Sequence, residues 1–284
     1  LLDGNLHQQT GAFTGDVYVD GNDPDFQKDD AIALLRAIKE NGIKKVTGKL
    51  VVSSRFSLYC SGSALASGRG LVKIFRNGID GSGVVIEGPC QAGDMSETSQ
   101  LLSEHESEAL QETLKVMLSR SLNGAAERIG SVVGGVSRLE QIAIDDVGIP
   151  ASSIHITSAS GLGQNRITPK NMMLVLLALG AELKKSGLDY QSILPVAGID
   201  DGTLEKRFTG ETERGSVIAK TGTLGQTDGG VSALVGVVRT QKEDLYFVLF
   251  GWHGGVSGFR SLQDATIREL QEQRGGPKPF DYQS

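Results

Sequence analysis

The order in which the hydrophobic pattern changes along the chain constrains the fold most. Residues 12–56 alternate between strand-like runs and one helical stretch, which indicates a small α/β unit. From residue 103 apolar side chains recur at helical spacing, and from residue 214 strand-like runs separated by turn residues precede a last helical stretch. We therefore predict a mixed α/β (α+β) fold in which an α/β unit, a helical part and a sheet with a terminal helix follow one another.

This order also predicts two domains. We assign residues 1–100 to an N-terminal part that contains the α/β unit at about 12–56. The Gly/Ser-rich stretch near 61–83 is interpreted as the connection between domains. Residues 101–284 form the second domain, with a helical part at 101–190 and the sheet with its terminal helix at 191–284.

Local signals mark several element ends. The helical pattern breaks between Ser119 and Asn123, where poor helix formers cluster, so we predict two helices joined by a polar elbow. Thr168 and Pro169 suit the cap and first position of another helix. The buried stripe of the last helix is predicted to be Leu262, Ile267 and Leu270.

Composition excludes some classes of partner. The net charge is −6 and basic residues are scattered, which argues against nucleic acid or an anionic membrane as the main partner. The longest apolar stretch, residues 172–183, is interrupted by Gly180 and Glu182, so we predict no transmembrane segment. Cys60 and Cys90 are the only cysteines, and the four histidines show no ligand spacing, so we predict no metal site. Whether the two thiols form a disulfide stays open.

The tetrad Lys220-Thr221-Gly222-Thr223 follows the apolar run Val217–Ala219 directly. A phosphate-binding loop needs a glycine before the Lys-Thr pair, and Ala219 stands there, so this interpretation fails. The structural alternative is a strand end with a lysine whose amine reaches solvent. The functional alternative is a cation fixed at the edge of a binding site.

Two other polar stretches have structural alternatives of their own. In Ser121-Leu122-Asn123 a hydroxyl and a carboxamide lie two residues apart at the predicted elbow, although serine and asparagine are also preferred helix caps. The Gly161-Leu162-Gly163 stretch has Arg166 where a dinucleotide fingerprint needs its third glycine, so we interpret it as a turn.

Together these stretches resemble a known family. The Ser-x-Asn elbow and the Lys-Thr-Gly strand match two of the three motifs of penicillin-binding proteins and class A β-lactamases. The chain is similar to the class C, low-molecular-mass penicillin-binding proteins, the serine-type D-alanyl-D-alanine carboxypeptidase/endopeptidase family. The matching stretches, in family order, are "GDVYVDGNDPDF", "VTGKLVV", "MLSRSLNGAAERI", "SASGLGQNRITP", "LPVAGIDDGTLEKRF" and "AKTGTL".

The resemblance implies a transpeptidase-like fold, in which helices flank an antiparallel sheet next to a helical subdomain and a small inserted α/β domain. It implies proteolysis of peptidoglycan stem peptides ending in D-Ala-D-Ala through an acyl-enzyme, inhibition by β-lactam antibiotics, and a place in the bacterial cell envelope, periplasmic or extracytoplasmic. No cofactor is implied. The catalytic residues by resemblance are Ser121, Asn123 and Lys220, and the substrate-binding residues are Thr221, Gly222 and Thr223.

One departure from the family pattern is serious. The family's nucleophile lies in Ser-x-x-Lys, which occurs nowhere in the 284 residues, and Thr203-x-x-Lys206 lies in another signature. The sequence begins with Leu1 instead of a methionine, and its first residues show no signal-peptide pattern, so we expect it to start partway through a longer protein. We also expect these residues alone to form no adduct with penicillin. A non-catalytic peptidoglycan-binding scaffold and a β-lactamase or esterase on the same fold remain alternatives.

Overall fold

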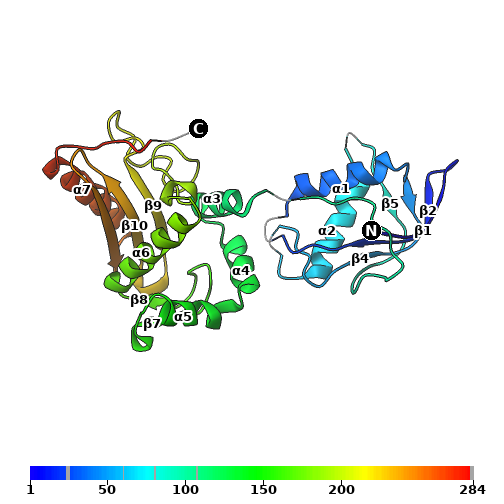
Figure 1. Ribbon diagram of the computed structural model, residues 1–284, viewed down its shortest axis with the longest axis horizontal. Coiled ribbons are helices and arrows are strands. Elements are labelled where there is room, and N and C mark those ends of the chain that lie inside the picture. Colours follow the sequence, from blue (N-terminus) through cyan, green and yellow to red (C-terminus); the bar gives the residue numbers. More distant parts are fainter. Residues whose placement is uncertain (24–25, 60, 80, 107, 282–284) are drawn as a thin grey trace. The chain divides into compact units, whose positions relative to one another are not determined.

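The chain forms two compact units, Leu1–Glu108 and Ala109–Ser284, as seen in a computed structural model (Figure 1). The structure describes residues 1–23, 26–59, 61–79, 81–106 and 108–281. The predicted domain boundary is at residue 100, whereas the first unit extends to Glu108. Each unit has its own hydrophobic core.

The first unit is a sheet covered by two helices. Strand β2 pairs antiparallel with β1 and in parallel with β3 and β4. Strand β3 then pairs in parallel with β5, and β4 pairs in parallel with β6. Side chains of β2, α1 and α2 share one core, in which Phe13, Leu35, Leu71 and Phe75 are almost fully buried. The elements are β1 Leu2–His7, β2 Ala12–Val19, α1 Lys28–Glu40, β3 Lys45–Val46, β4 Leu50–Val52, α2 Ala64–Asn77, β5 Val85–Ile86 and β6 Cys90–Ala92.

A row of glycines crosses this sheet. Gly4 pairs with Gly15, Gly48 N–H donates to the Gly15 carbonyl at 3.1 Å, and Gly88 N–H donates to the Gly48 carbonyl at 3.0 Å. A Cβ added to Gly15 or Gly48 would lie 2.1 Å from a carbonyl oxygen of the next segment, and one added to Gly88 would lie 2.3 Å away. At Gly15, Gly48 and Gly88 the neighbouring backbone segments therefore lie closer together than a Cβ would allow. This close approach explains why glycine occupies these positions.

The Gly/Ser-rich stretch near 61–83 is not the connection between domains, so that prediction is wrong. Residues 64–77 form α2 inside the first unit, and the Ser63 hydroxyl caps the helix by accepting the Ala66 N–H at 3.3 Å. A Cβ on Gly68 would lie 2.5 Å from the Cys90 sulfur. The small residues allow the helix to pack closely on the sheet, a use of glycine that composition alone does not distinguish from flexibility.

The open question of a disulfide concerns two residues of this unit. Cys90 is a free thiol, and burial raises the pKa of that thiol. Cys60 lies outside the described residues.

The second unit begins with helices and ends with a sheet. Its three long strands are antiparallel in the order β11-β10-β9, and β7 and β8 form a separate two-stranded pair. The predicted order of helical part, strands and terminal helix is confirmed. The elements are α3 Leu110–Arg120, α4 Asn123–Val132, α5 Gly135–Asp145, β7 Ile154–His155, β8 Arg166–Ile167, α6 Pro169–Lys185, β9 Val217–Leu224, β10 Val231–Arg239, β11 Asp244–Trp252 and α7 Val256–Gln273, with short 3-10 helices at Ala151–Ser153, Tyr190–Ser192 and Thr227–Gly229.

Helices cover both faces of this sheet. Val217 and Ala219 of β9 pack with Ile267 of α7 in one core cluster, and α7 lies along β10 in Figure 1. Ile218, whose side chain points the opposite way along the strand, packs with Leu183 of α6 in another cluster. As predicted, the Thr168 hydroxyl caps α6 by accepting the Asn171 N–H at 3.2 Å.

The predicted stripe of α7 is partly wrong. Ile267 is fully buried and Leu270 packs against the core, but Leu262 is 65% exposed. Gln263 and Gln271 are buried instead, because each carboxamide has a partner: Gln263 donates to the Ser232 carbonyl at 3.2 Å and Gln271 to the Ser216 hydroxyl at 2.8 Å. These hydrogen bonds of the amide NH2 groups lower the cost that normally keeps glutamine at the surface, although the Gln271 side-chain oxygen is buried without a partner among the described residues. A hydrophobic pattern does not contain such partners.

Candidate active site

The elbow between α3 and α4 places Ser121 in an unusual backbone conformation. Its φ of 55° and ψ of 53° lie in the left-handed region, which costs a residue other than glycine roughly 1–2 kcal/mol. The Leu122 N–H donates to the Met117 carbonyl at 2.9 Å and helps to hold this turn. The N-cap residue of α4 is Leu122, with no side-chain hydrogen bond at the cap, and Ser121 is the left-handed C-cap residue of α3. Side-chain capping of the α4 N-terminus therefore does not explain Ser121 or Asn123. Strained positions of this kind are frequent at functional sites.

The loop before β9 is clamped to this elbow. The Thr203 N–H donates to the Ser119 carbonyl at 3.0 Å, and a Cβ on Gly202 would lie 2.2 Å from the same oxygen. One turn earlier on α3, Lys115 forms an ion pair with Asp200 at 2.6 Å. The "DGTL" stretch therefore positions the residues just before Ser121, a role that the sequence analysis did not assign to it.

Ser121 and Lys220 meet although 99 residues separate them in the sequence. The Lys220 ammonium donates to the Ser121 hydroxyl oxygen at 2.9 Å and to the Thr221 carbonyl at 2.6 Å. This distance agrees with the hydrogen-bond reach that a proton relay needs. Burial lowers the pKa of Lys220 to about 8 because a charged amine loses hydration there. Lys220 can therefore exchange a proton close to neutral pH. A lysine with its amine in solvent, as in the structural alternative, would keep its proton at this pH.

The outer edge of β9 is covered along its first half only. The Ala197 N–H donates to the Val217 carbonyl at 2.9 Å, and the Ala219 N–H donates to the Pro195 carbonyl at 3.1 Å. By strand alternation the N–H groups of Thr221 and Thr223 point to the same outer side. Within the described part of the chain neither N–H has a hydrogen-bond partner on that side. The Lys-Thr-Gly-Thr half of β9 is thus an open strand edge beside Ser121.

The remaining predicted residues lie around this pair. Asn123 is the exposed first residue of α4, and its carboxamide has no hydrogen bond among the described residues. Gly222 is partly exposed, and a Cβ there would lie 3.3 Å from that of Ala233 on β10. The structure brings Ser121 together with Lys220 of the tetrad. Asn123 lies two residues after Ser121, at the start of α4.

The Gly161 stretch has the geometry of a structural turn. The Asn165 side-chain oxygen accepts the N–H groups of Thr157 at 2.7 Å and Ser158 at 3.1 Å. Ser160 donates its hydroxyl to Glu127 of α4 at 2.6 Å, and this bond lowers the pKa of Glu127. The stretch therefore braces α4, the helix that Asn123 begins.

Among the described residues no group of three or more His, Cys, Asp or Glu side chains could hold a metal ion. No helix in the described ranges is long and apolar enough to cross a membrane.

Comparisons with known sequences identify relatives. A sequence profile of the D-Ala-D-Ala carboxypeptidase 3 (S13) family matches residues 63–265. A D-alanyl-D-alanine carboxypeptidase from an Actinomadura species is 28% identical over 225 residues, which cover 72% of this chain and 40% of that protein. A penicillin-sensitive carboxypeptidase A from Dictyostelium discoideum is 34% identical over 117 residues, 41% of this chain and 21% of that protein. The chain thus matches less than half the length of either relative.

Solved structures share the fold. A predatory peptidoglycan endopeptidase from Bdellovibrio bacteriovorus superposes with a TM-score of 0.75 at 20% identity, over 100% of this chain and 82% of that chain. Its penicillin G acylated form gives 0.76 at 20% identity, over 100% and 81%. Penicillin binding protein 4 from Haemophilus influenzae gives 0.70 at 20% identity, over 94% and 85%. The fold is therefore that of the penicillin-binding proteins, as predicted.

Proposed function

Because the chain belongs to the D-Ala-D-Ala carboxypeptidase 3 (S13) family, we propose that its Ser121–Lys220 site acts on peptidoglycan stem peptides that end in D-Ala-D-Ala. The observation that supports this most directly is the 2.9 Å hydrogen bond between Lys220 and Ser121 beside the open edge of β9. Members of this family are serine-type hydrolases. The proposed activity is that of a carboxypeptidase or endopeptidase working through an acyl-enzyme in the bacterial cell envelope.

The open edge of β9 is the proposed peptide-binding surface. An extended peptide can add to a strand edge through main-chain hydrogen bonds, here to the outward N–H groups of Thr221 and Thr223. Gly222 leaves the surface next to Lys220 free of a side chain. The Thr223 N–H is the proposed donor to the oxyanion of the tetrahedral intermediate, a type of contact worth about 3–4 kcal/mol in other enzymes.

The Ser121–Lys220 pair is the proposed proton relay. When a nucleophilic serine attacks the scissile carbonyl, its oxygen–carbon bond forms and the peptide carbon–nitrogen bond breaks. The proton of that serine passes through the Ser121 hydroxyl to the departing amine, and Lys220 holds this hydroxyl in place. Water then releases the acyl group. Asn123 is the proposed partner of the donor peptide's amide.

The 284 residues supply only part of this reaction. They contain no Ser-x-x-Lys, so the nucleophile and its base are not among them. This observation favours a second candidate function, a non-catalytic peptidoglycan-binding protein that uses the same strand edge. Both functions predict binding of D-Ala-D-Ala peptides. β-Lactams are proposed ligands of the same edge, because penicillin G acylates the Bdellovibrio endopeptidase that shares this fold.

Calorimetry with a diacetylated L-Lys-D-Ala-D-Ala peptide tests the proposed site. We expect binding of this peptide, much weaker binding of the diastereomer that ends in L-Ala-L-Ala, and loss of binding in Lys220→Ala. Lys242→Ala, in the exposed hairpin turn after β10, removes the same charge and should bind like the wild type. Equal binding of the two diastereomers would contradict the proposed substrate.

Release of D-alanine from the same peptide separates the two candidate functions. The enzyme function predicts release only when a Ser-x-x-Lys segment is supplied with these residues. The non-catalytic function predicts binding without release in the native protein.

A further inference from the structure

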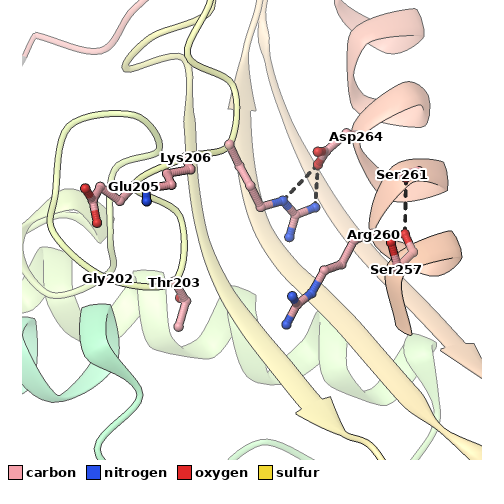
Figure 2. Close-up of a pocket in the computed structure, with 9 residues that line it drawn as sticks. Gly202, Thr203, Glu205, Lys206, Ser257, Arg260, Ser261 and Asp264 are labelled. Carbon is pink, nitrogen blue, oxygen red and sulfur yellow. Dashed lines mark hydrogen bonds and ion pairs between the residues drawn. The ribbon is translucent and has the colours of Figure 1, made fainter. Parts of the chain in front are cut away.

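A pocket of about 470 Å³ lies between the loop that precedes β9 and the N-terminal half of α7. The loop contributes Gly202, Thr203, Glu205, Lys206 and Arg207, and α7 contributes Ser257, Arg260, Ser261 and Asp264. The close-up in Figure 2 shows the Arg260 side chain extending from α7 across the sheet side of this space. Its loop wall is the same segment that is clamped to the Ser121 elbow through Thr203.

The charged groups of the pocket favour an anion. Among the described residues the pocket is lined by the cations Lys206, Arg207 and Arg260 and by the acids Glu205 and Asp264. Asp264 already has a partner, since the Arg207 guanidinium donates to its carboxylate at 2.9 Å. In the described part of the chain Arg260 has no carboxylate partner. Because Arg207 occupies the carboxylate of Asp264, the Arg260 guanidinium is available to an anionic ligand.

Arg260 also connects this pocket to the proposed peptide-binding edge. Its guanidinium donates to the Thr223 hydroxyl oxygen at 3.0 Å. Because that oxygen accepts a hydrogen bond, the hydrogen of the hydroxyl remains able to donate to another acceptor. One N–H of the guanidinium is used in this contact, so others remain for a ligand beside Thr223.

Lys220 has fewer donors to spare. Of its three N–H groups, one donates to Ser121 and one to Thr221. Burial also lowers the pKa of this amine, so part of its charge is lost near neutral pH. Arginine stays charged and can offer two parallel donors to a carboxylate. A carboxylate at the strand edge can be approached from both faces of β9, by Lys220 on one and by Arg260 with Thr223 on the other.

We propose that Arg260 is a specificity-determining residue, which together with the Thr223 hydroxyl binds the terminal carboxylate of a peptide lying along the open edge of β9. This inference rests on the proposed function of that edge. It assigns the preference for a free C-terminal carboxylate to a residue of the terminal helix, outside the three sequence motifs.

Calorimetry with two peptides on the full chain tests the assignment. The probes are diacetylated L-Lys-D-Ala-D-Ala and its C-terminal amide, which differ only in the charge of the carboxylate. We expect Arg260→Gln to weaken binding of the acid about fivefold and to leave binding of the amide unchanged, since an exposed charged contact is worth up to about 1 kcal/mol. Arg260→Lys should retain part of the preference. Arg274→Gln, at the far end of α7, has the same change in charge and should retain all of it.

The outcomes distinguish a failure of the Arg260 assignment from a failure of the proposed function of the β9 edge. If the wild type prefers the acid and Arg260→Gln keeps this preference in full, the assignment of Arg260 is wrong and the proposed function stands. If Arg260→Gln weakens the acid and the amide equally, Arg260 only supports the fold of the edge and the assignment is again wrong. If the wild type binds neither peptide, the proposed function itself fails, and with it the inference.

Discussion

Burial of the Lys220 amine changes its protonation, and through it both the chemistry of the site and the stability of the fold. Its amine donates to the Ser121 hydroxyl and to the Thr221 carbonyl, and burial lowers its pKa to about 8. The ordinary value of a lysine is 10.5. The folded state therefore loses this proton at a lower pH than the unfolded state does.

This difference predicts a pH-dependent stability. Between about pH 8 and 10.5 the unfolded chain binds more protons at Lys220 than the folded chain, so the free energy of unfolding rises with pH in that window. Relative to Lys220→Met, the wild type should gain up to about 1.4 kcal/mol per pH unit. Urea unfolding of both proteins at pH 7, 8, 9 and 10 measures the difference. A constant difference over this range would contradict the lowered pKa.

Ser121 predicts a conflict between stability and function. Its left-handed φ of 55° suits glycine, so Ser121→Gly should be more stable than Ser121→Ala by about 1 kcal/mol. Both variants remove the hydroxyl that Lys220 contacts, so both should lose the proposed proton relay. Thermal unfolding of the two variants measures the comparison. Equal stability would mean that the elbow is not strained at this position.

At the scale of elements, close backbone approaches set the geometry of both units. Glycines form a row across the first sheet, and Gly202 allows the loop before β9 to reach the Ser119 carbonyl. In both places a Cβ would collide with a carbonyl oxygen, an atom that moves only if the backbone moves. Such positions are more sensitive to a small substitution than most core positions are.

Gly48→Ala should therefore destabilise the first unit by about 3 kcal/mol, because the added Cβ would lie 2.1 Å from the Gly15 carbonyl oxygen. Gly62→Ala is the matched control, since nothing lies within 4 Å of a Cβ there. Urea unfolding compares the two variants with the wild type. A change below about 1 kcal/mol in Gly48→Ala would show that the strands separate at little cost.

At the scale of the whole molecule, the residues assigned to substrate binding and proton transfer are present without the Ser-x-x-Lys that the family uses for acylation. We therefore expect the polypeptide of residues 1–284 to form no covalent adduct with a labelled penicillin. Mass spectrometry after incubation checks this. An adduct mapped to Ser121 would mean that the nucleophile has been assigned wrongly, since Ser121 hydrogen bonds to Lys220 and could then act with it as a pair.

The sequence by itself determined the features that depend on neighbouring residues. The break at Ser119–Asn123, the cap at Thr168 and the strand that carries Lys220 all follow from local backbone preferences and the spacing of apolar residues, although the strand continues to Leu224 and does not end at the lysine. The motifs at Ser121 and Lys220 were recognised because their residue types and order are those of a family. The resemblance assigned both residues to one catalytic site, and no local rule contains their contact at 2.9 Å.

The tertiary structure decided what depends on residues far apart in the chain. It buried Gln263 and Gln271 in place of Leu262, placed the Gly/Ser-rich stretch in a helix against Cys90, and brought Arg260 to Thr223. Each of these depends on a partner that becomes adjacent only when helices and strands pack. The contribution of a polar or small side chain is set by that partner, and a one-dimensional pattern of hydrophobicity does not contain it.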